Sequence, residues 1–126
     1  MRIWLSLVVA AMLQSPAAPK KGGNPEAAKI KNPVAASADS TAAGKRVYTR
    51  MCSRCHGAEG KGDGTAATAP VPDLTDAKWD YGGSDGEIFS VIHDGVSADM
   101  DGYAARLSDA DIWNVVNYVR SVAAKP

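Results

Sequence analysis

The chain has 126 residues with 14 basic and 14 acidic side chains, so its formal net charge is zero. A chain of this length forms one compact domain at most, and its balanced charge excludes the strongly basic composition typical of nucleic-acid-binding proteins. Because much of the N-terminal third has little apolar surface, the folded part is small, and small domains often depend on a disulfide, a metal or a cofactor.

Residues 1–17 have the pattern of a secretory signal peptide. A charged start at Met1 and Arg2 precedes an apolar run from Ile3 to Leu13, and small residues follow it. The apolar run has 11 residues, fewer than the roughly 20 that cross a bilayer. The sequence therefore predicts an exported, periplasmic protein, attached to a membrane only if this segment is retained.

Residues 18–38 predict a flexible lead-in to the domain. They consist mainly of Pro, Ala, Gly and Lys, with Ile30 and Val34 as the larger aliphatic side chains. This is too little apolar surface to offset the entropy lost on ordering. The folded domain is expected to cover residues 39–126.

Three helices are predicted within that domain. The first begins near Asp39 and extends to the cysteines, the second begins with a capping box at Ser84 and ends at Gly95, and the third follows a cap at Ser108. The apolar residues that recur at helical spacing and would face the core are Val47, Tyr48, Met51, Ile88, Val91, Ile92, Ile112, Val115, Val116 and Val119.

The segments between these helices show no sustained alternation of β-branched residues, so the predicted fold class is all-α. Two long loops, 57–83 and 95–107, join the helices. Loops of this length count against a compact domain unless something inside the domain orders them.

Residues 52–56 carry the chemistry. Cys52, Cys55 and His56 form the C-x-x-C-H pattern of covalent haem attachment. Two thiols three positions apart at a helix end can form thioethers with the two vinyl groups on one side of a porphyrin, and the adjacent imidazole then lies over the iron. We therefore expect one covalent haem c, with His56 as the first axial ligand to its iron.

Other uses of the two cysteines fit less well. A disulfide between Cys52 and Cys55 would close a very small loop and constrain the unfolded chain little. A zinc site normally needs four ligands, and the other histidine in the chain is the isolated His93. A redox dithiol needs a βαβ setting that the sequence does not predict.

Over about residues 40–122 the chain resembles the small monohaem cytochrome c family. Gly44 and Tyr48 resemble the family's first helix, in which a glycine is followed four positions later by an aromatic residue. In that family the glycine permits a close crossing with an aromatic residue on the last helix, which here would be Trp113 or Tyr118. The resemblance implies a cytochrome c fold, with three main helices and long loops around one haem. It also implies that the carbonyl of Pro72 accepts a hydrogen bond from His56 and orients the imidazole.

The second axial ligand has three candidates: Met51, His93 and Met100. Met51 adjoins the attachment cysteines and cannot easily reach the opposite haem face, and His93 suits the negative end of a helix. Met100 lies in a loop before the last helix, where the resembled family carries its methionine ligand. The family often has proline after that methionine, whereas this chain has Asp101.

His56 and Met100 together would fill both axial positions, which favours a single-electron carrier and not an enzyme. The alternative is a haem enzyme or a gas- or peroxide-binding sensor in which Met100 is labile. Residues 38–126 carry nine basic and thirteen acidic side chains, a net charge of −4. The expected partners are therefore redox proteins with basic docking surfaces, such as a dehydrogenase, an oxidase or another cytochrome, unless the acids serve solubility alone.

Overall fold

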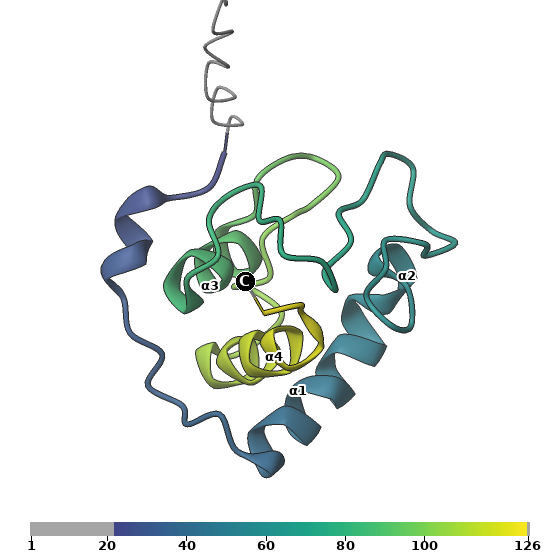
Figure 1. Cartoon of the computed structure of the whole chain (residues 1–126). Helices are drawn as coiled ribbons and strands as arrows, with labels where there is room; N and C mark the ends of the chain where they lie inside the picture. Colours follow the sequence, from purple (N-terminus) through teal and green to yellow (C-terminus); the bar gives the residue numbers. More distant parts are fainter. Residues whose placement is uncertain (1–21, 126) are drawn as a thin grey trace, which may run out of the picture.

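The computed structural model describes residues 22–125, which form helices and loops without any strand (Figure 1). The elements in chain order are the 3-10 helix η1 (Pro25–Lys29) and the α-helices α1 (Ala38–Met51), α2 (Ser53–His56), α3 (Asp85–Asp94) and α4 (Asp109–Val122). The all-α prediction is confirmed: α1, α3 and α4 are the three expected helices, and α2 is one further turn after α1. The predicted signal peptide lies outside the described residues. Over residues 22–125, no helix combines the length and apolar character needed to cross a bilayer.

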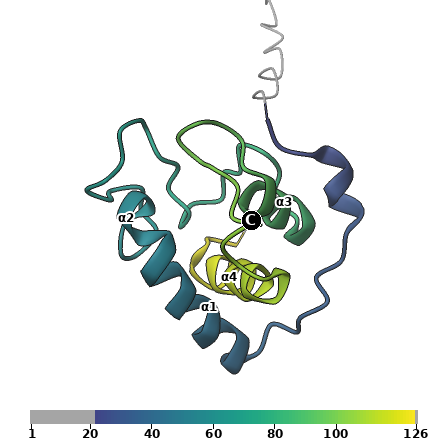
Figure 2. The ribbon, with the colours of Figure 1, turned by 180° about the vertical axis from the view of Figure 1, so that it is seen from behind.

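Helices α1 and α4 cross at Gly44, and Figures 1 and 2 show them side by side from opposite directions. A Cβ added to Gly44 would overlap the backbone carbonyl of Asn114 and lie 2.9 Å from the Cβ of Tyr118. One turn further along, the rings of Tyr48 and Tyr118 meet with their centroids 5.1 Å apart. Of the two aromatic partners that the sequence left open, the structure therefore selects Tyr118.

Helix α3 packs on the other side of α4. It begins with the predicted capping box, in which Ser84 and Glu87 bond each other's backbone N–H groups. The remaining aromatic candidate, Trp113, stacks on Phe89 of α3 with ring centroids 4.1 Å apart. The buried core residues are Val47, Tyr48, Ile88, Ile92, Leu107, Ile112, Trp113, Val115, Val116, Tyr118 and Val119.

Residues 22–37, which we call the N-terminal strap, differ from the flexible lead-in expected from composition. In the strap η1 packs on α3, and Ala27 within it is fully buried. The Asn32 amide nitrogen donates to the Asn117 side-chain oxygen at 2.7 Å and to Asp85 at 3.2 Å. Two small apolar contacts, the buried Ala27 and Val34 packed against the core, hold this segment to the domain together with a set of amide hydrogen bonds.

The Gly44 crossing gives a first prediction. Gly44→Ala should destabilise the haem-loaded protein by about 1 to 3 kcal/mol, because the added methyl group forces α1 away from the Asn114 carbonyl. This loss should exceed the gain of up to about 1 kcal/mol that alanine brings to a helix interior. Denaturant unfolding measures the change, and the neighbouring Lys45→Ala on the exposed face should stay within about 0.5 kcal/mol of wild type. A Gly44→Ala protein as stable as wild type would contradict the close crossing.

Candidate haem site

The attachment motif occupies the turn that follows α1. Cys52 ends α1, and the backbone N–H of His56 donates to the Cys52 carbonyl at 3.0 Å, so residues 52–56 form one helical turn that stops at Gly57. Gly57 has a φ of +85°, in the left-handed region that favours glycine. The two cysteines are not joined in a disulfide. Both thiols and the imidazole are thus carried on one short, well-defined element.

A cavity of about 420 Å³ opens beside this turn. Its walls come from the attachment turn, the two long loops, α3 and α4. The five residues predicted for the site all line it: Cys52, Cys55, His56, Pro72 and Met100. The residues that complete its mostly apolar lining include Ala66, Ala67, Val71, Leu74, Trp79, Tyr81, Ile88, Val91, Ile92, Val96, Tyr103, Val115 and Val119.

This cavity fits a haem by the chemistry of its donors and walls. Two thiols and an imidazole lie at one side and a thioether lies in a loop from another part of the chain, while apolar side chains supply most of the surface between them. The loops that seemed too long for a compact domain form much of the wall. Such a space can hold a flat apolar group with two attachment points, and a group of this kind would order the loops.

The environment of His56 favours the neutral imidazole that binds iron. Burial lowers its pKa below the ordinary value, and the Pro72 carbonyl opposes this as a backbone hydrogen-bond acceptor. His56 Nδ1 is buried and makes no well-formed hydrogen bond with any described residue. The Pro72 carbonyl is thus a weak partner, and burial has the larger effect on the pKa of His56.

The Cys52 thiol is also affected by burial. Burial, assisted by the nearby Cys55, raises the pKa of Cys52 to about 11. The Cys52 thiol is thus neutral at physiological pH, and since the thiolate is the nucleophile in thiol–disulfide exchange, burial makes Cys52 a poor attacking group in that reaction.

The three candidates for the second axial ligand lie in different places. Met51 is absent from the cavity wall, and its carbonyl accepts a hydrogen bond from the Tyr103 hydroxyl at 3.2 Å. His93 is also absent from it: its Nδ1 lies 2.7 Å from Asp94, and its ring stacks on Phe89. Only Met100 of the three lines the cavity.

A tight turn presents Met100. The N–H of Val96 donates to the Met100 carbonyl at 3.1 Å, and the N–H of Met100 donates to the Ser97 hydroxyl at 3.2 Å. Gly95 and Asp101 pair as an antiparallel bridge at the base. We call residues 96–100 the Met100 turn; its outer residues are exposed, and Met100 packs against the core.

Two features that support the motif were not predicted. The buried Tyr48 hydroxyl donates to the Gly57 carbonyl at 2.6 Å, and burial raises the Tyr48 pKa, so the hydroxyl stays a donor. The start of loop 57–83 then folds back on the motif. The Gly62 N–H donates to the His56 carbonyl at 2.8 Å, and the Ala66 N–H donates to the Arg54 carbonyl at 2.9 Å. The spacing of Tyr48 and Gly57 gives no sequence signal, because the bond depends on the chain reversal at Gly57.

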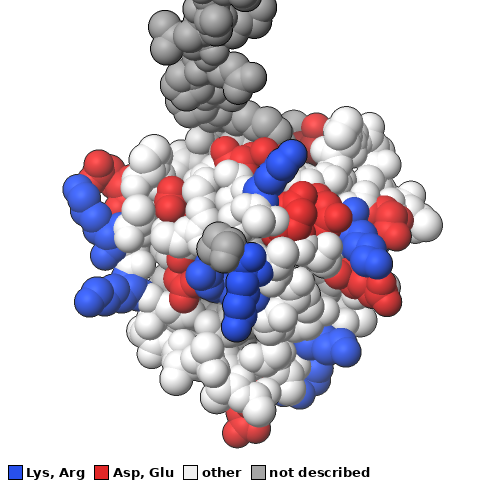
Figure 3. Space-filling view, in the orientation of Figure 1, with Lys and Arg blue, Asp and Glu red and all other residues white. Residues whose placement is uncertain are grey.

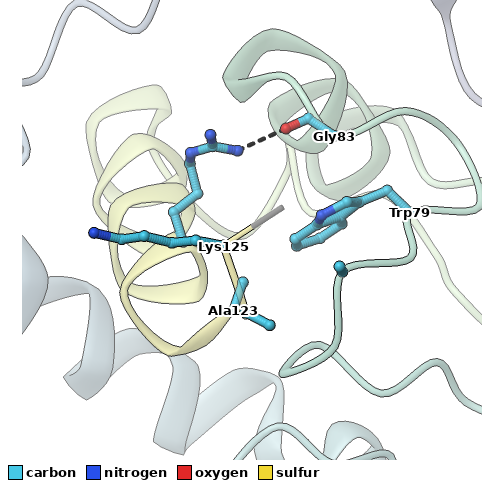
Figure 4. A pocket seen from close by; sticks show the side chains of 7 residues that line it. Trp79, Gly83, Ala123 and Lys125 are labelled. Atoms are coloured by element: carbon cyan, nitrogen blue, oxygen red, sulfur yellow. Dashed lines mark hydrogen bonds between the residues drawn. The ribbon is translucent and has the colours of Figure 1, made fainter.

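A second hollow, of about 380 Å³, lies near the end of the described chain (Figure 4). Trp79 lines both this hollow and the main cavity, and Lys125 and Ala123 lie across from it. The Arg120 guanidinium at its edge donates to the Gly83 carbonyl at 2.6 Å and pairs with Asp85 at 2.8 Å. This hollow contains none of the residues predicted for the site.

A covalent attachment turn that opens on an apolar cavity, in a domain of three main helices, defines the class of the protein as a c-type cytochrome. More particularly, the chain belongs to the family described as cytochrome c oxidase, cbb3-type, subunit III, which matches residues 39–119. Its cofactor is one covalently bound haem c with its iron.

Known proteins similar to the chain agree with this class. The cbb3-type cytochrome c oxidase subunit CcoP of Azospirillum sp. (strain B510) is 34% identical over 93 residues, which cover 72% of this chain and 31% of that protein. In structure, the reducing HAO-like protein complex Kustc0457/Kustc0458 of Kuenenia stuttgartiensis has a TM-score of 0.67 at 28% identity, covering 75% of this chain and 50% of that one. Cytochrome cL of Methylophaga aminisulfidivorans has a TM-score of 0.61 at 27% identity, covering 69% and 55%. The chain spans less than a third of the length of the curated relatives it matches.

The attachment turn generates a second prediction. Haem in the matured protein should stay with the polypeptide under acid-acetone extraction, because thioethers to Cys52 and Cys55 survive conditions that break axial bonds. The double variant Cys52→Ala/Cys55→Ala should retain no haem after extraction and should fold poorly, since the loops lose the surface on which they pack. Haem absorbance of the protein pellet measures the first effect and circular dichroism the second. Free haem released from matured wild-type protein would contradict covalent attachment.

Proposed function

We propose that the chain is an exported electron-transfer module, a carrier of single electrons and not an enzyme. In this proposal Cys52 and Cys55 would hold the haem, and His56 and Met100 would be the two axial ligands to its iron. The observation that carries the proposal is that Met100, alone among the three candidate donors, lines the same cavity as the attachment turn.

The residues of the site suit that role. When bound, the haem supplies an iron that changes between ferrous and ferric states. A methionine ligand favours the ferrous state and raises the reduction potential relative to two imidazoles. The Pro72 carbonyl, although a weak partner here, would help to orient His56, and the mostly apolar wall would limit the water that reaches the site. With both axial positions held by side chains, no coordination site is left for a substrate.

The alternative, a haem enzyme or sensor with a labile Met100, is less well supported. Its basis in the sequence is the acidic, proline-free stretch around Met100. In the structure that stretch is a closed turn, with the Val96–Met100 hydrogen bond at 3.1 Å and the bridge between Gly95 and Asp101. Of the similar proteins named above, CcoP is an oxidase subunit and cytochrome cL is a cytochrome, which supports electron transfer over catalysis by this domain.

The proposed partner is a redox protein with a basic docking surface. Residues 38–126 have a net charge of −4, and Figure 3 shows acidic side chains spread over the upper half of one face, with basic side chains among them. The exposed charged residues that line the main cavity are Asp80, Asp99 and Lys78, so its rim has a net charge of −1. The two acids would steer a basic partner toward the haem site. The names of the curated relatives make a terminal oxidase one candidate for that partner.

Export is part of the proposal. The pattern of residues 1–17 supports a secretory signal, and a covalent haem is attached outside the cytoplasm, where an exported chain would receive it. The proposed location of the domain is the periplasm.

The assignment of Met100 gives a third prediction. Oxidised wild-type protein should show a weak absorption band near ~695 nm, which reports a thioether bound to ferric iron. Met100→Ala should abolish the band, lower the reduction potential and let ferrous protein bind CO. The matched control Met51→Leu should keep the band, because Met51 does not line the cavity. Visible spectroscopy and a redox titration measure these effects.

Two results would overturn the assignment. Rapid CO binding by wild-type protein at neutral pH would show that the iron is open, and a band that survives Met100→Ala would show that another residue is the ligand. In the first case the ligand-binding alternative would replace the carrier.

The acidic rim gives a fourth prediction. The association rate with a basic redox partner should fall as salt rises, since charges are screened over about 8 to 10 Å near physiological ionic strength. Asp99→Asn should slow association at low salt by about twofold, whereas Asp39→Asn, in the first turn of α1 and at the far end of that helix from Cys52, should change it little. Stopped-flow electron transfer measures both rates. A rate that is flat with salt would leave the acids with a role in solubility alone.

A further inference from the structure

We propose that the N-terminal strap is a positioning element for the haem site: it braces the Met100 turn against the cavity and so keeps Met100 available to the iron. This inference rests on the proposed function, because it takes Met100 as the second axial ligand. The strap was not predicted to have any role in the site.

The first contact is between the start of the strap and two residues of the cavity wall. A Cβ added to Gly22 would lie 3.1 Å from the Val96 carbonyl oxygen, and one added to Gly23 would lie 3.0 Å from the Cβ of Tyr81. Both glycines have positive φ values, +114° and +73°, which residues with side chains rarely adopt. Glycine thus allows the strap backbone to lie directly on Val96 and Tyr81, both of which also line the cavity.

The second step is the link from Val96 to Met100. Val96 opens the Met100 turn, and its N–H donates to the Met100 carbonyl at 3.1 Å. Ser97, Ala98 and Asp99 are exposed, so the turn has few apolar contacts of its own. Loops of this kind open at low free energy unless a neighbouring segment holds them. The strap supplies such a segment at the residue where the turn begins.

The third step is that the strap is itself fixed to the helices. Ala27, within η1, is fully buried. The Gly86 backbone of α3 lies so close to the strap that a Cβ added to Gly86 would overlap the Ala27 carbonyl and lie 2.6 Å from the Ile30 carbonyl. Further along, Asn32 donates to the Asn117 side chain of α4 at 2.7 Å. Figures 1 and 2 show the strap running beside α3 from the loops down to the start of α1. The Met100 turn is thus tied to α3 and α4 through the strap.

Ala27→Glu in the haem-loaded protein tests the proposal, with Ala28→Glu as its control. The two variants add the same charge at adjacent positions of η1, but Ala27 is buried and Ala28 is exposed. A buried glutamate should lift the strap. We expect Ala27→Glu to lose the ~695 nm band at neutral pH and to speed amide hydrogen exchange at Val96 and Met100 by about tenfold or more. Ala28→Glu should match wild type in both measurements.

Gly86→Ala is a second variant that tests the same proposal if Ala27→Glu does not fold. The three atoms nearest to its new methyl group all belong to the strap, and alanine favours helix over glycine, so the strap is displaced without weakening α3. Loss of the band and faster exchange in this variant support the proposal. Wild-type exchange rates at Val96 and Met100 in the folded variants overturn it.

The same measurements separate this inference from the proposed function. If wild-type protein itself lacks the band, Met100 is not the ligand and the proposed function fails. Hydrogen exchange at Val96 still shows whether the strap holds the turn: unchanged rates in Gly86→Ala would refute the brace, and faster rates would support it.

Discussion

The close contact between Gly44 and the Asn114 carbonyl is the constraint on which the rest of the domain depends. It brings α1 against α4 at backbone distance and so fixes the direction in which α1 leaves the crossing. One turn later, Tyr48 packs on Tyr118 and donates its hydroxyl to the Gly57 carbonyl at 2.6 Å. The helix crossing therefore places the attachment turn at the end of α1.

The long loops depend on that placement in turn. They form a wall around the cavity that the attachment turn opens into, and their own apolar side chains, such as Val71 and Leu74, supply much of its lining. A covalent haem would give these side chains an apolar surface to pack on. In the proposed function the consequence lies at Met100, because a loop closed over the iron would make a carrier and a loose loop would make a ligand-binding site. The difference between those functions would then depend on local loop stability, for which we propose the strap contact at Val96.

The helices, their caps and the attachment motif could be predicted because each has a local cause: periodic apolar residues, the Ser84–Glu87 box and the C-x-x-C-H spacing. The strap could not, because it is held by amide hydrogen bonds from Asn32, one buried alanine and Val34. Two isolated apolar residues form no periodic pattern that a sequence analysis could recognise. The sequence could not choose between Tyr118 and Trp113 as the partner of Tyr48, because both residues are buried on α4. The structure shows that Tyr118 contacts Tyr48 of α1, whereas Trp113 contacts Phe89 of α3.

The most direct test of the account is X-ray absorption at the iron edge, measured on both ferric and ferrous protein. A carrier with His56 and Met100 as axial ligands should show a single sulfur scatterer beside nitrogen donors in both oxidation states, with the same coordination number in each. An iron that lacks the sulfur, or that gains an open position on reduction, would contradict the claim that side chains of this chain close the site.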